Sequence, residues 1–429
     1  MTRSTVRGPA KILILLLLLL GTDRAGAGDS WPEFRGPDAN GHADASPLPL
    51  HWSEERNVKW KTPIHDRGWS TPVVLGDQVW MTTATPDGKQ MFAICVDRAT
   101  GRIVHDRKLF DVESPRPLGN TVNGYASPSP VIEPGRVYVS FGSYGTACLD
   151  TRTGEPVWTR RDLPCNHFRG PASSPILFEN LLIMPMDGVD FQYVVALDKR
   201  TGHTVWNVNR STNFNDLDAD GRPRADGDLR KAYNTPVLMT IDGQTQMISP
   251  GAKAAIAYDP RTGKEFWKVH YPGHSTASRT VFGGGLVFLN TGYSQAQLWA
   301  VRIGGRGDVT ESHVVWKCTQ GVSNRSSPVL VGENLYMCSD KGIASCLNAQ
   351  TGKLIWKHRV GGNYSASLVY ADGKIHFFSE EGKTTIMKPG PEPRVLTTNQ
   401  LDDGFMASPA IAGQALYLRT RTHLYRIEE

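Results

Sequence analysis

Residues 150–158 read DTRTGEPVW, and this stretch decides the fold because the chain contains four close copies of it. Those copies are DRATGRIVH (97–105), DKRTGHTVW (198–206), DPRTGKEFW (259–267) and NAQTGKLIW (348–356). An Asp or Asn side chain bonds to backbone amides that follow it, and Gly supplies the positive φ that closes a tight turn between strands. A large ring four residues after the Gly suits packing between neighbouring sheets. The repeat therefore predicts a structural hairpin and not a catalytic motif.

A second recurring piece lies upstream of each turn. It consists of Ser-Pro or Thr-Pro, a short apolar run, a polar turn and another strand. Examples are STPVVLGDQVWMTTA (70–84), SPVIEPGRVYVSFG (129–142), SSPVLVGENLYMCS (326–339) and SPAIAGQALYLRT (408–420). Together the two pieces give four short antiparallel strands per unit. Four-stranded units repeated at this spacing are typical of a β-propeller.

Eight such units can be counted, starting near residues 68, 125, 170, 232, 274, 324, 363 and 405. The fifth and seventh units lose the turn signature, and the eighth ends at Glu429 with only three strands. We expect NVKWKTP (57–63) to supply its fourth strand, because Trp60 stands where the other units place their Trp. The sequence predicts an all-β, eight-bladed β-propeller of four-stranded antiparallel blades over residues 57–429. An N-terminal strand closes this ring, and an N-terminal extension, residues 28–56, precedes it.

Residues 1–27 have the features of a secretory signal peptide. A basic start is followed by the apolar run Ile12–Leu20 and by the small residues Ala25-Gly26-Ala27. Nine apolar residues are too few for a membrane span, which needs about 20. We therefore expect an exported protein, periplasmic or extracellular, with no transmembrane segment in the mature chain.

The charge of the chain argues against a nucleic-acid partner. The sequence has 47 Lys and Arg and 42 Asp and Glu residues, and four of the basic residues lie in the predicted signal. The remainder is close to neutral and contains no dense Lys and Arg run, whereas nucleic-acid binding usually needs a basic stripe.

Three of the six cysteines occupy a position of the repeat at which the other copies have a small side chain. Cys95, Cys148 and Cys346 each precede the Asp or Asn of the repeat by two residues, where Ala196 and Ala257 stand in the other copies. Free Cys packs as a small hydrophobic residue, so we expect buried thiols at these positions. The spacing of Cys165, Cys318 and Cys338 assigns no pairing, and no CxxC motif supports a zinc site.

The repeat resembles the tryptophan-docking repeat of the pyrroloquinoline quinone (PQQ)-like propellers. That family includes quinoprotein dehydrogenases and the outer-membrane assembly factor BamB. The opening WPEFRGP (31–37) also looks like the start of secreted bacterial PQQ-like repeat proteins, and the resemblance covers roughly residues 31–427. Because one fold hosts many functions, the resemblance is specific for the fold and not for the activity.

The resemblance implies two classes of function. Quinoprotein dehydrogenases hold PQQ with calcium in the central funnel, usually with an adjacent Cys-Cys pair and an Asp base. This chain has no adjacent cysteines, and eight blades take up most of its length and leave few residues for catalytic insertions. The resemblance thus favours a non-catalytic binding or scaffold propeller for a partner protein or a polar ligand, and it disfavours PQQ as a cofactor. The alternative is a PQQ- and calcium-dependent dehydrogenase of alcohols or sugars.

A ligand or partner would be bound at one mouth of the channel. The segments that lead into the eight innermost strands converge there and carry rings with polar tips and a few cations, which suit a polar, anionic or sugar-like ligand. The alternative is a solvated rim without a ligand. No catalytic set can be assigned. The predicted rim residues are Trp69, Tyr125, His167, Arg169, Lys231, Tyr233, His274, Arg325 and Tyr364.

One insertion carries part of a calcium-binding pattern. Asp216, Asp218 and Asp220, followed by Gly221, match the first half of a calcium loop, in which alternating carboxylates reach one ion. The second half does not match, because the twelfth position is Gly227 instead of Glu. The sequence leaves two interpretations, a calcium site and a solvated acidic loop.

Overall fold

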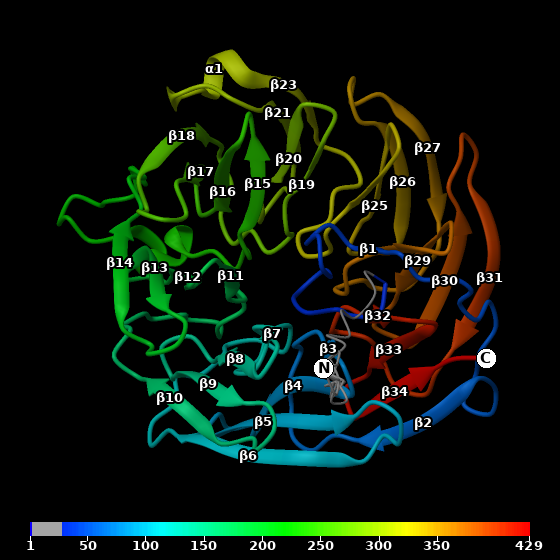
Figure 1. Ribbon diagram of the computed structural model, residues 1–429. Helices are drawn as coiled ribbons and strands as arrows, with labels where there is room; N and C mark the ends of the chain where they lie inside the picture. The colour runs from blue at the N-terminus through cyan, green and yellow to red at the C-terminus, as the bar shows by residue number, and fades with distance from the viewer. Residues whose placement is uncertain (2–27) are drawn as a thin grey trace.

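The repeats fold as eight blades arranged in a ring, as the sequence predicted (Figure 1). A computed structural model describes residue 1 and residues 28–429, so the predicted signal peptide lies outside the described residues apart from Met1. Every blade is a four-stranded antiparallel sheet whose first strand is innermost. The degenerate fifth and seventh units form complete blades, so strand pairing tolerates the loss of the turn signature.

The first four blades follow the order of the chain. Their strands are β3 (Val73–Leu75), β4 (Gln78–Ala84), β5 (Gln90–Asp97) and β6 (Ile103–Asp111) in blade 1; β7 (Val131–Glu133), β8 (Arg136–Ser140), β9 (Thr146–Asp150) and β10 (Pro156–Arg160) in blade 2; β11 (Ile176–Phe178), β12 (Leu181–Asp187), β13 (Gln192–Asp198) and β14 (Thr204–Asn209) in blade 3; and β15 (Val237–Ile241), β16 (Gln244–Pro250), β17 (Ala254–Tyr258) and β18 (Glu265–His270) in blade 4.

The last four blades complete the ring. Their strands are β19 (Val281–Gly283), β20 (Leu286–Asn290), β21 (Leu298–Arg302) and β23 (Val314–Cys318) in blade 5; β24 (Val329–Val331), β25 (Asn334–Cys338), β26 (Ile343–Asn348) and β27 (Leu354–Arg359) in blade 6; β28 (Val369–Ala371), β29 (Lys374–Phe378), β30 (Lys383–Lys388) and β31 (Arg394–Gln400) in blade 7; and β32 (Ala410–Ala412), β33 (Ala415–Arg419), β34 (His423–Ile427) and β2 (Val58–Pro63) in blade 8.

Four short elements lie outside this scheme. Strand β1 (His42–Ala43) pairs in parallel with β28, and β22 (Gly307–Asp308) pairs in parallel with β18. The 3-10 helix η1 (Arg224–Arg230) and the helix α1 (Thr310–His313) each span a few residues. No helix in residues 28–429 is long or apolar enough to cross a membrane.

The repeated turn holds each blade against the next. In blade 3, the Asp198 carboxylate accepts hydrogen bonds from the backbone N–H (2.9 Å) and the hydroxyl (3.0 Å) of Thr201. Gly202 follows with φ +76°, and a Cβ there would lie 2.7 Å from the Trp158 ring of blade 2. The Trp158 indole N–H donates to the Lys199 carbonyl at 3.0 Å. Glycine is therefore required both for its backbone conformation and for the space under the ring.

The same contact recurs around the ring. Trp60, Trp206 and Trp316 donate their indole N–H groups to carbonyls on the turn of the following blade. Trp267 of blade 4 faces blade 5, which lacks the turn signature. Its indole N–H donates instead to the Gln246 side chain of its own blade at 2.9 Å. The indole N–H of Trp267 thus finds a partner even though the turn signature is missing in blade 5.

The Ser-Pro and Thr-Pro positions, together with Ser367 at the equivalent place in blade 7, form a second connection. It is here called the hydroxyl belt (Thr71, Ser129, Ser174, Thr235, Ser327, Ser367 and Ser408). The Ser129 hydroxyl accepts the Thr71 backbone N–H, and the Ser174 hydroxyl accepts that of Ser129, both at 2.9 Å. The pattern continues to Thr235 and, in a second arc, from Arg279 through Ser327 and Ser367 to Ser408. The belt fixes the starts of the innermost strands relative to one another.

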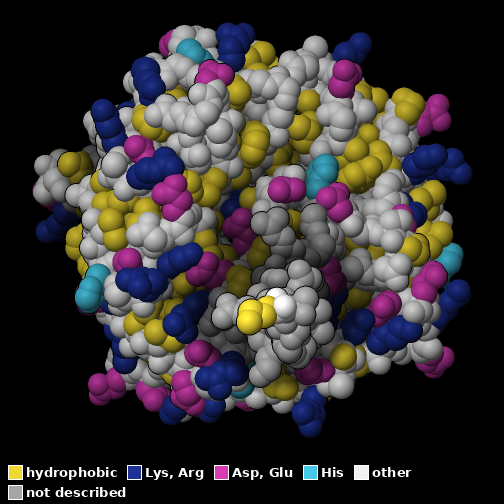
Figure 2. Space-filling view, viewed as in Figure 1, with side chains coloured by type: hydrophobic (Ala, Val, Ile, Leu, Met, Phe, Trp, Pro, Cys, Tyr) yellow, Lys and Arg dark blue, Asp and Glu magenta, His cyan; other side chains and the backbone are white. Residues whose placement is uncertain are grey.

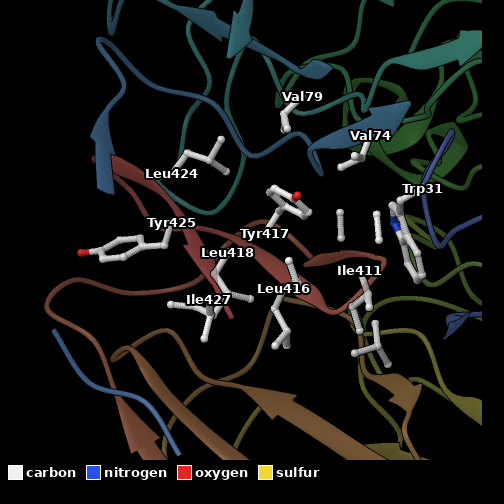
Figure 3. Packing of buried hydrophobic residues seen from close by; sticks show 14 of the residues in the cluster. Trp31, Val74, Val79, Ile411, Leu416, Tyr417, Leu418, Leu424, Tyr425 and Ile427 are labelled. Carbon is white, nitrogen blue, oxygen red and sulfur yellow. The ribbon is translucent and has the colours of Figure 1, made fainter. Parts of the chain in front are cut away.

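Strand β2 closes the ring, as the sequence predicted. It pairs antiparallel with β34, and Trp60 lies opposite Arg426. The seam between blades 8 and 1 is filled by apolar side chains. Figure 3 shows Tyr417 of blade 8 on one side of this seam, with Val74 and Val79 of blade 1 on the other.

The N-terminal extension crosses the channel, which the sequence did not predict (Figure 1). Within it, residues 31–37 are here called the channel segment. Trp31 exchanges backbone hydrogen bonds with Val74 of blade 1, and the Arg35 guanidinium donates to the carbonyls of Pro328 (2.6 Å) and Leu368 (2.7 Å) in blades 6 and 7. Burial lowers the pKa of Arg35 to about 9, so the guanidinium still carries its charge at neutral pH. The channel segment therefore connects blade 1 with blades 6 and 7.

Charges of both signs are mixed on the surface. On the face seen in Figure 2, Lys and Arg side chains are interspersed with Asp and Glu, in keeping with the near-neutral composition.

The first prediction concerns ring closure. Trp60→Ala removes a partly buried ring and its hydrogen bond from the seam, so it should lower the free energy of unfolding by about 2–3 kcal/mol, somewhat less than a fully buried Trp. Unfolding should remain a single transition, measured by denaturant titration. The exposed neighbour Lys59 provides the control, since Lys59→Ala should change stability by less than about 0.5 kcal/mol. An unchanged stability, or a separate early transition, would contradict closure through β2.

The second prediction concerns the thiols. All six cysteines are free, and Cys95, Cys148 and Cys346 are fully buried, as predicted. Burial raises the pKa of Cys148 to about 12 and that of Cys346 to about 11. These three thiols should resist iodoacetamide in the folded protein and react after denaturation without reductant, whereas the partly exposed Cys318 should react first. Mass spectrometry of the labelled peptides measures this order, and rapid native labelling of the three would refute it.

Candidate functional site

The mouth of the channel opens into a cavity of about 520 Å³, here called the funnel. Side chains of the hydroxyl belt lie in its wall, and Phe34 of the channel segment also lines it. All eight blades, or the loops that lead into them, contribute to the lining. One residue from each, in blade order, is Trp69, Ser127, Arg169, Tyr233, His274, Arg325, Ser365 and Met406.

Six of the nine predicted rim residues line the funnel. They are Trp69, Arg169, Lys231, Tyr233, His274 and Arg325. Two of the other three are buried behind the wall: the Tyr125 hydroxyl donates to the Arg116 carbonyl at 2.8 Å, and Tyr364 lies in an apolar cluster of blades 6 and 7. The structure thus brings together the predicted residues of blades 1, 3, 4, 5 and 6.

The third, His167, has a structural environment. Its Nε2 accepts the Ser143 backbone N–H at 3.1 Å, and its Nδ1 lies 3.6 Å from the Cys165 sulfur. Burial lowers the pKa of His167 to about 4, so the ring is neutral at physiological pH. A neutral ring held by these contacts supports the loop and does not face the funnel.

A group of charged side chains occupies the funnel wall at the entrance to blade 4. The buried Lys231 ammonium contacts the Asp228 carboxylate and lies 4.9 Å from the Phe168 ring. Arg169 lies 3.9 Å from the same carboxylate. Burial, and then Arg169, lower the pKa of Lys231 to about 7, while contact with Asp228 acts in the opposite sense and favours the ammonium. Asp228 is therefore shared by two cations.

A second charged group lies at the entrance to blade 6. Arg325 is 3.3 Å from the Glu380 carboxylate and 3.9 Å from that of Asp340. Asp340 also accepts hydrogen bonds from the Ser323 hydroxyl and from the backbone and side chain of Asn324. Both carboxylates are thus held by neighbours.

Aromatic side chains supply the remaining wall. The His274 ring meets the Tyr293 ring edge to face at 5.8 Å, and burial, with Lys231 nearby, lowers the pKa of His274 to about 4. The Trp69 Nε1 and the Tyr233 hydroxyl are both buried without a hydrogen-bond partner among residues 28–429. Such unpaired donors are costly unless a ligand or water satisfies them.

Several wall residues were not predicted from the sequence. Tyr293 and Asp340 lie on the loops between the second and third strands of their blades, and these loops share the mouth with the segments that lead into the innermost strands. That topology was the available signal for both. Phe34 reaches the wall only because the channel segment crosses the ring, and no local pattern indicates this.

The predicted calcium ligands do not fit an ion as they stand. The Asp216 carboxylate accepts two hydrogen bonds from Arg230, at 2.6 and 2.8 Å. The Asp218 carboxylate accepts the backbone N–H groups of Asp220 and Arg222. Among the described residues no group of three or more His, Cys, Asp or Glu side chains is arranged to hold a metal. Calcium binding would require Asp216 to leave Arg230, and it stays a prediction from the sequence.

The funnel does not fit a quinone held with calcium either. Calcium needs six to eight oxygen ligands, several of them usually carboxylates. The Asp228 carboxylate instead contacts the Lys231 ammonium, and the Asp340 carboxylate accepts hydrogen bonds from Ser323 and Asn324. No step through PQQ is therefore derived for this chain.

Comparisons with known proteins agree with the fold. Over 253 residues the chain is 24% identical to the tetrathionate hydrolase of Acidithiobacillus ferrooxidans, a match covering 54% of this chain and 48% of that protein. The chain thus spans about half the length of that curated relative.

Two solved structures are similar. The structure of BamB from Moraxella catarrhalis has a TM-score of 0.58 and 13% identity, covering 86% of this chain and 99% of that chain. A europium-containing methanol dehydrogenase has a TM-score of 0.61 and 13% identity, covering 92% and 89%. At these identities the likeness shows the fold alone.

The family comparison covers more than half of the chain. The model of the PQQ-like family described as outer membrane protein assembly factor BamB matches residues 190–429. This match confirms the resemblance found in the repeat, and the chain belongs to this family of β-propellers.

Proposed function

We propose that this chain is a non-catalytic binding propeller that takes a polar small molecule into its funnel. The observation that carries the proposal is the pair of unpaired donors in the wall, Trp69 Nε1 and the Tyr233 hydroxyl. A buried donor without an acceptor costs about 1–3 kcal/mol. A ligand that accepts hydrogen bonds from both groups would recover part of that cost.

The size of the cavity favours a small molecule over a protein loop. Its volume of about 520 Å³ lies within the roughly 300–1,000 Å³ typical of small-molecule sites. A protein partner is the second candidate, because the family is described as an outer membrane protein assembly factor. Such a partner would contact the loops that surround the funnel.

The state of the acidic side chains supports binding over turnover. A general base must be free to take a proton from the substrate. Asp228 contacts Lys231, and Asp340 accepts hydrogen bonds from Ser323 and Asn324, so both carboxylates are already engaged. The low pKa of His274 likewise makes its ring a weak base.

The site of action that we propose is outside the cytoplasm. The proposal rests on the signal-like composition of residues 1–27 and on the outer-membrane description of the family.

The third prediction tests binding in the funnel. Calorimetric titration with neutral saccharides, dicarboxylates, sulfate and inorganic phosphate should show one-to-one binding for at least one class. Tyr233→Phe removes a single hydroxyl, so it should weaken that binding about fivefold, the value of one ordinary hydrogen bond. Tyr370 on β28 lies outside the funnel lining, and Tyr370→Phe should leave affinity unchanged. No binding in any class, or equal affinity in the two variants, would refute the proposal.

The fourth prediction separates binding from quinone-dependent catalysis. Purified protein supplied with PQQ and calcium should reduce no dye with alcohols or sugars, because the wall carboxylates are engaged by neighbouring side chains. Dye reduction that required both additives and disappeared in Lys231→Ala would establish the dehydrogenase instead.

A further inference from the structure

We infer that the ligand of the funnel is a neutral polyhydroxylated ring, a small saccharide, and not an anion. The inference rests on the proposed function and adds the chemical class of the ligand. Three observations carry it: the pairing of the wall charges, the supply of neutral donors, and the aromatic surfaces beside them.

The cations in the wall are already neutralised. Lys231 and Arg169 share Asp228, and Arg325 lies between Asp340 and Glu380. Three cations therefore face three carboxylates within 4.0 Å. An entering anion would have to separate these pairs or approach their carboxylates, and both cost free energy in a site partly shielded from water. A neutral ligand meets no such penalty.

The wall offers many neutral donors. Ser129, Ser174, Thr235 and Ser408 of the hydroxyl belt line the funnel, and each accepts a backbone N–H from a neighbouring blade. A hydroxyl that accepts one hydrogen bond keeps its own hydrogen to donate. These donors match the oxygens of a polyhydroxylated ligand, as do the two unpaired donors of Trp69 and Tyr233.

The aromatic side chains complete the match. Trp69, Tyr233, Tyr293 and Phe34 line the same wall as these donors. A sugar ring has the same division, with C–H groups on its faces and hydroxyls at its edge. The paired side chains Arg325 and Asp340 add a planar donor and an acceptor, which can bind adjacent hydroxyls without a net charge.

The test uses matched pairs of probes. Neutral mono- and disaccharides, among them glucose and methyl glucoside, are titrated beside their anionic counterparts glucuronate and glucose 6-phosphate, with sulfate and citrate as sugar-free anions. We expect the best neutral sugar to bind at least tenfold more tightly than its anionic counterpart. Its affinity should change less than twofold between 50 and 500 mM salt.

Two variants place the binding in the funnel. Trp69→Ala should weaken sugar binding at least tenfold because it removes a ring face and a donor together, and Tyr233→Phe should weaken it about fivefold while changing only one oxygen atom. The second variant keeps the test valid if the first fails to fold.

The two proposals fail in different ways. Funnel-dependent binding of glucuronate, phosphate, sulfate or citrate that weakens with salt would overturn the saccharide inference and leave the binding function standing. Absence of binding by every probe, neutral and anionic, would overturn both.

Discussion

The contact between a tryptophan ring and the glycine of the next blade's turn is the constraint on which the rest of the ring depends. Trp158 covers Gly202 so closely that no side chain fits there, and its N–H is bonded to the same turn. Each blade therefore sets the position of the following one. Where the next blade lacks the turn signature, the indole bonds to another acceptor: Trp267 donates to Gln246, and Trp356 donates to the Gly390 carbonyl.

The central channel becomes a binding cavity through two further constraints. The hydroxyl belt spaces the innermost strands, and the channel segment then crosses between them. Arg279 stands where a belt hydroxyl is missing, and its guanidinium donates to the Pro236 carbonyl (2.7 Å) and contacts Glu33 (3.1 Å). Where the belt is interrupted, blade 4 and the channel segment thus each supply a partner for Arg279. The ring and the N-terminal extension are one structure, because each satisfies buried polar groups of the other.

The fold could be predicted from the sequence because its determinants are local and repeated. The turn signature and the recurring Ser-Pro or Thr-Pro piece together predicted the blade count, and Trp60 located the closing strand. The site was less predictable, since position in a loop does not determine where a side chain points. Tyr125, Tyr233 and Tyr364 all precede innermost strands. Tyr233 lines the funnel, whereas Tyr125 and Tyr364 are buried in the core. Asp340 was missed because its loop has no recurring pattern, and only the ring topology brings it to the funnel.

The charges of the funnel follow from its partial burial. The Lys231 ammonium would be strongly destabilised there without a partner. The Asp228 carboxylate beside it lowers the free-energy cost of keeping the charge. Pairing of the wall cations with carboxylates removes most of the net electric field in the funnel. It leaves the directions of the N–H donors and oxygen acceptors fixed. A site of this kind discriminates between ligands by the geometry of hydrogen bonds more than by charge, because a ligand with misplaced hydroxyls leaves buried groups unpaired. Buried polar atoms need hydrogen-bond partners. This rule places the indole N–H groups on the turns, and it also determines which ligands the funnel can accept.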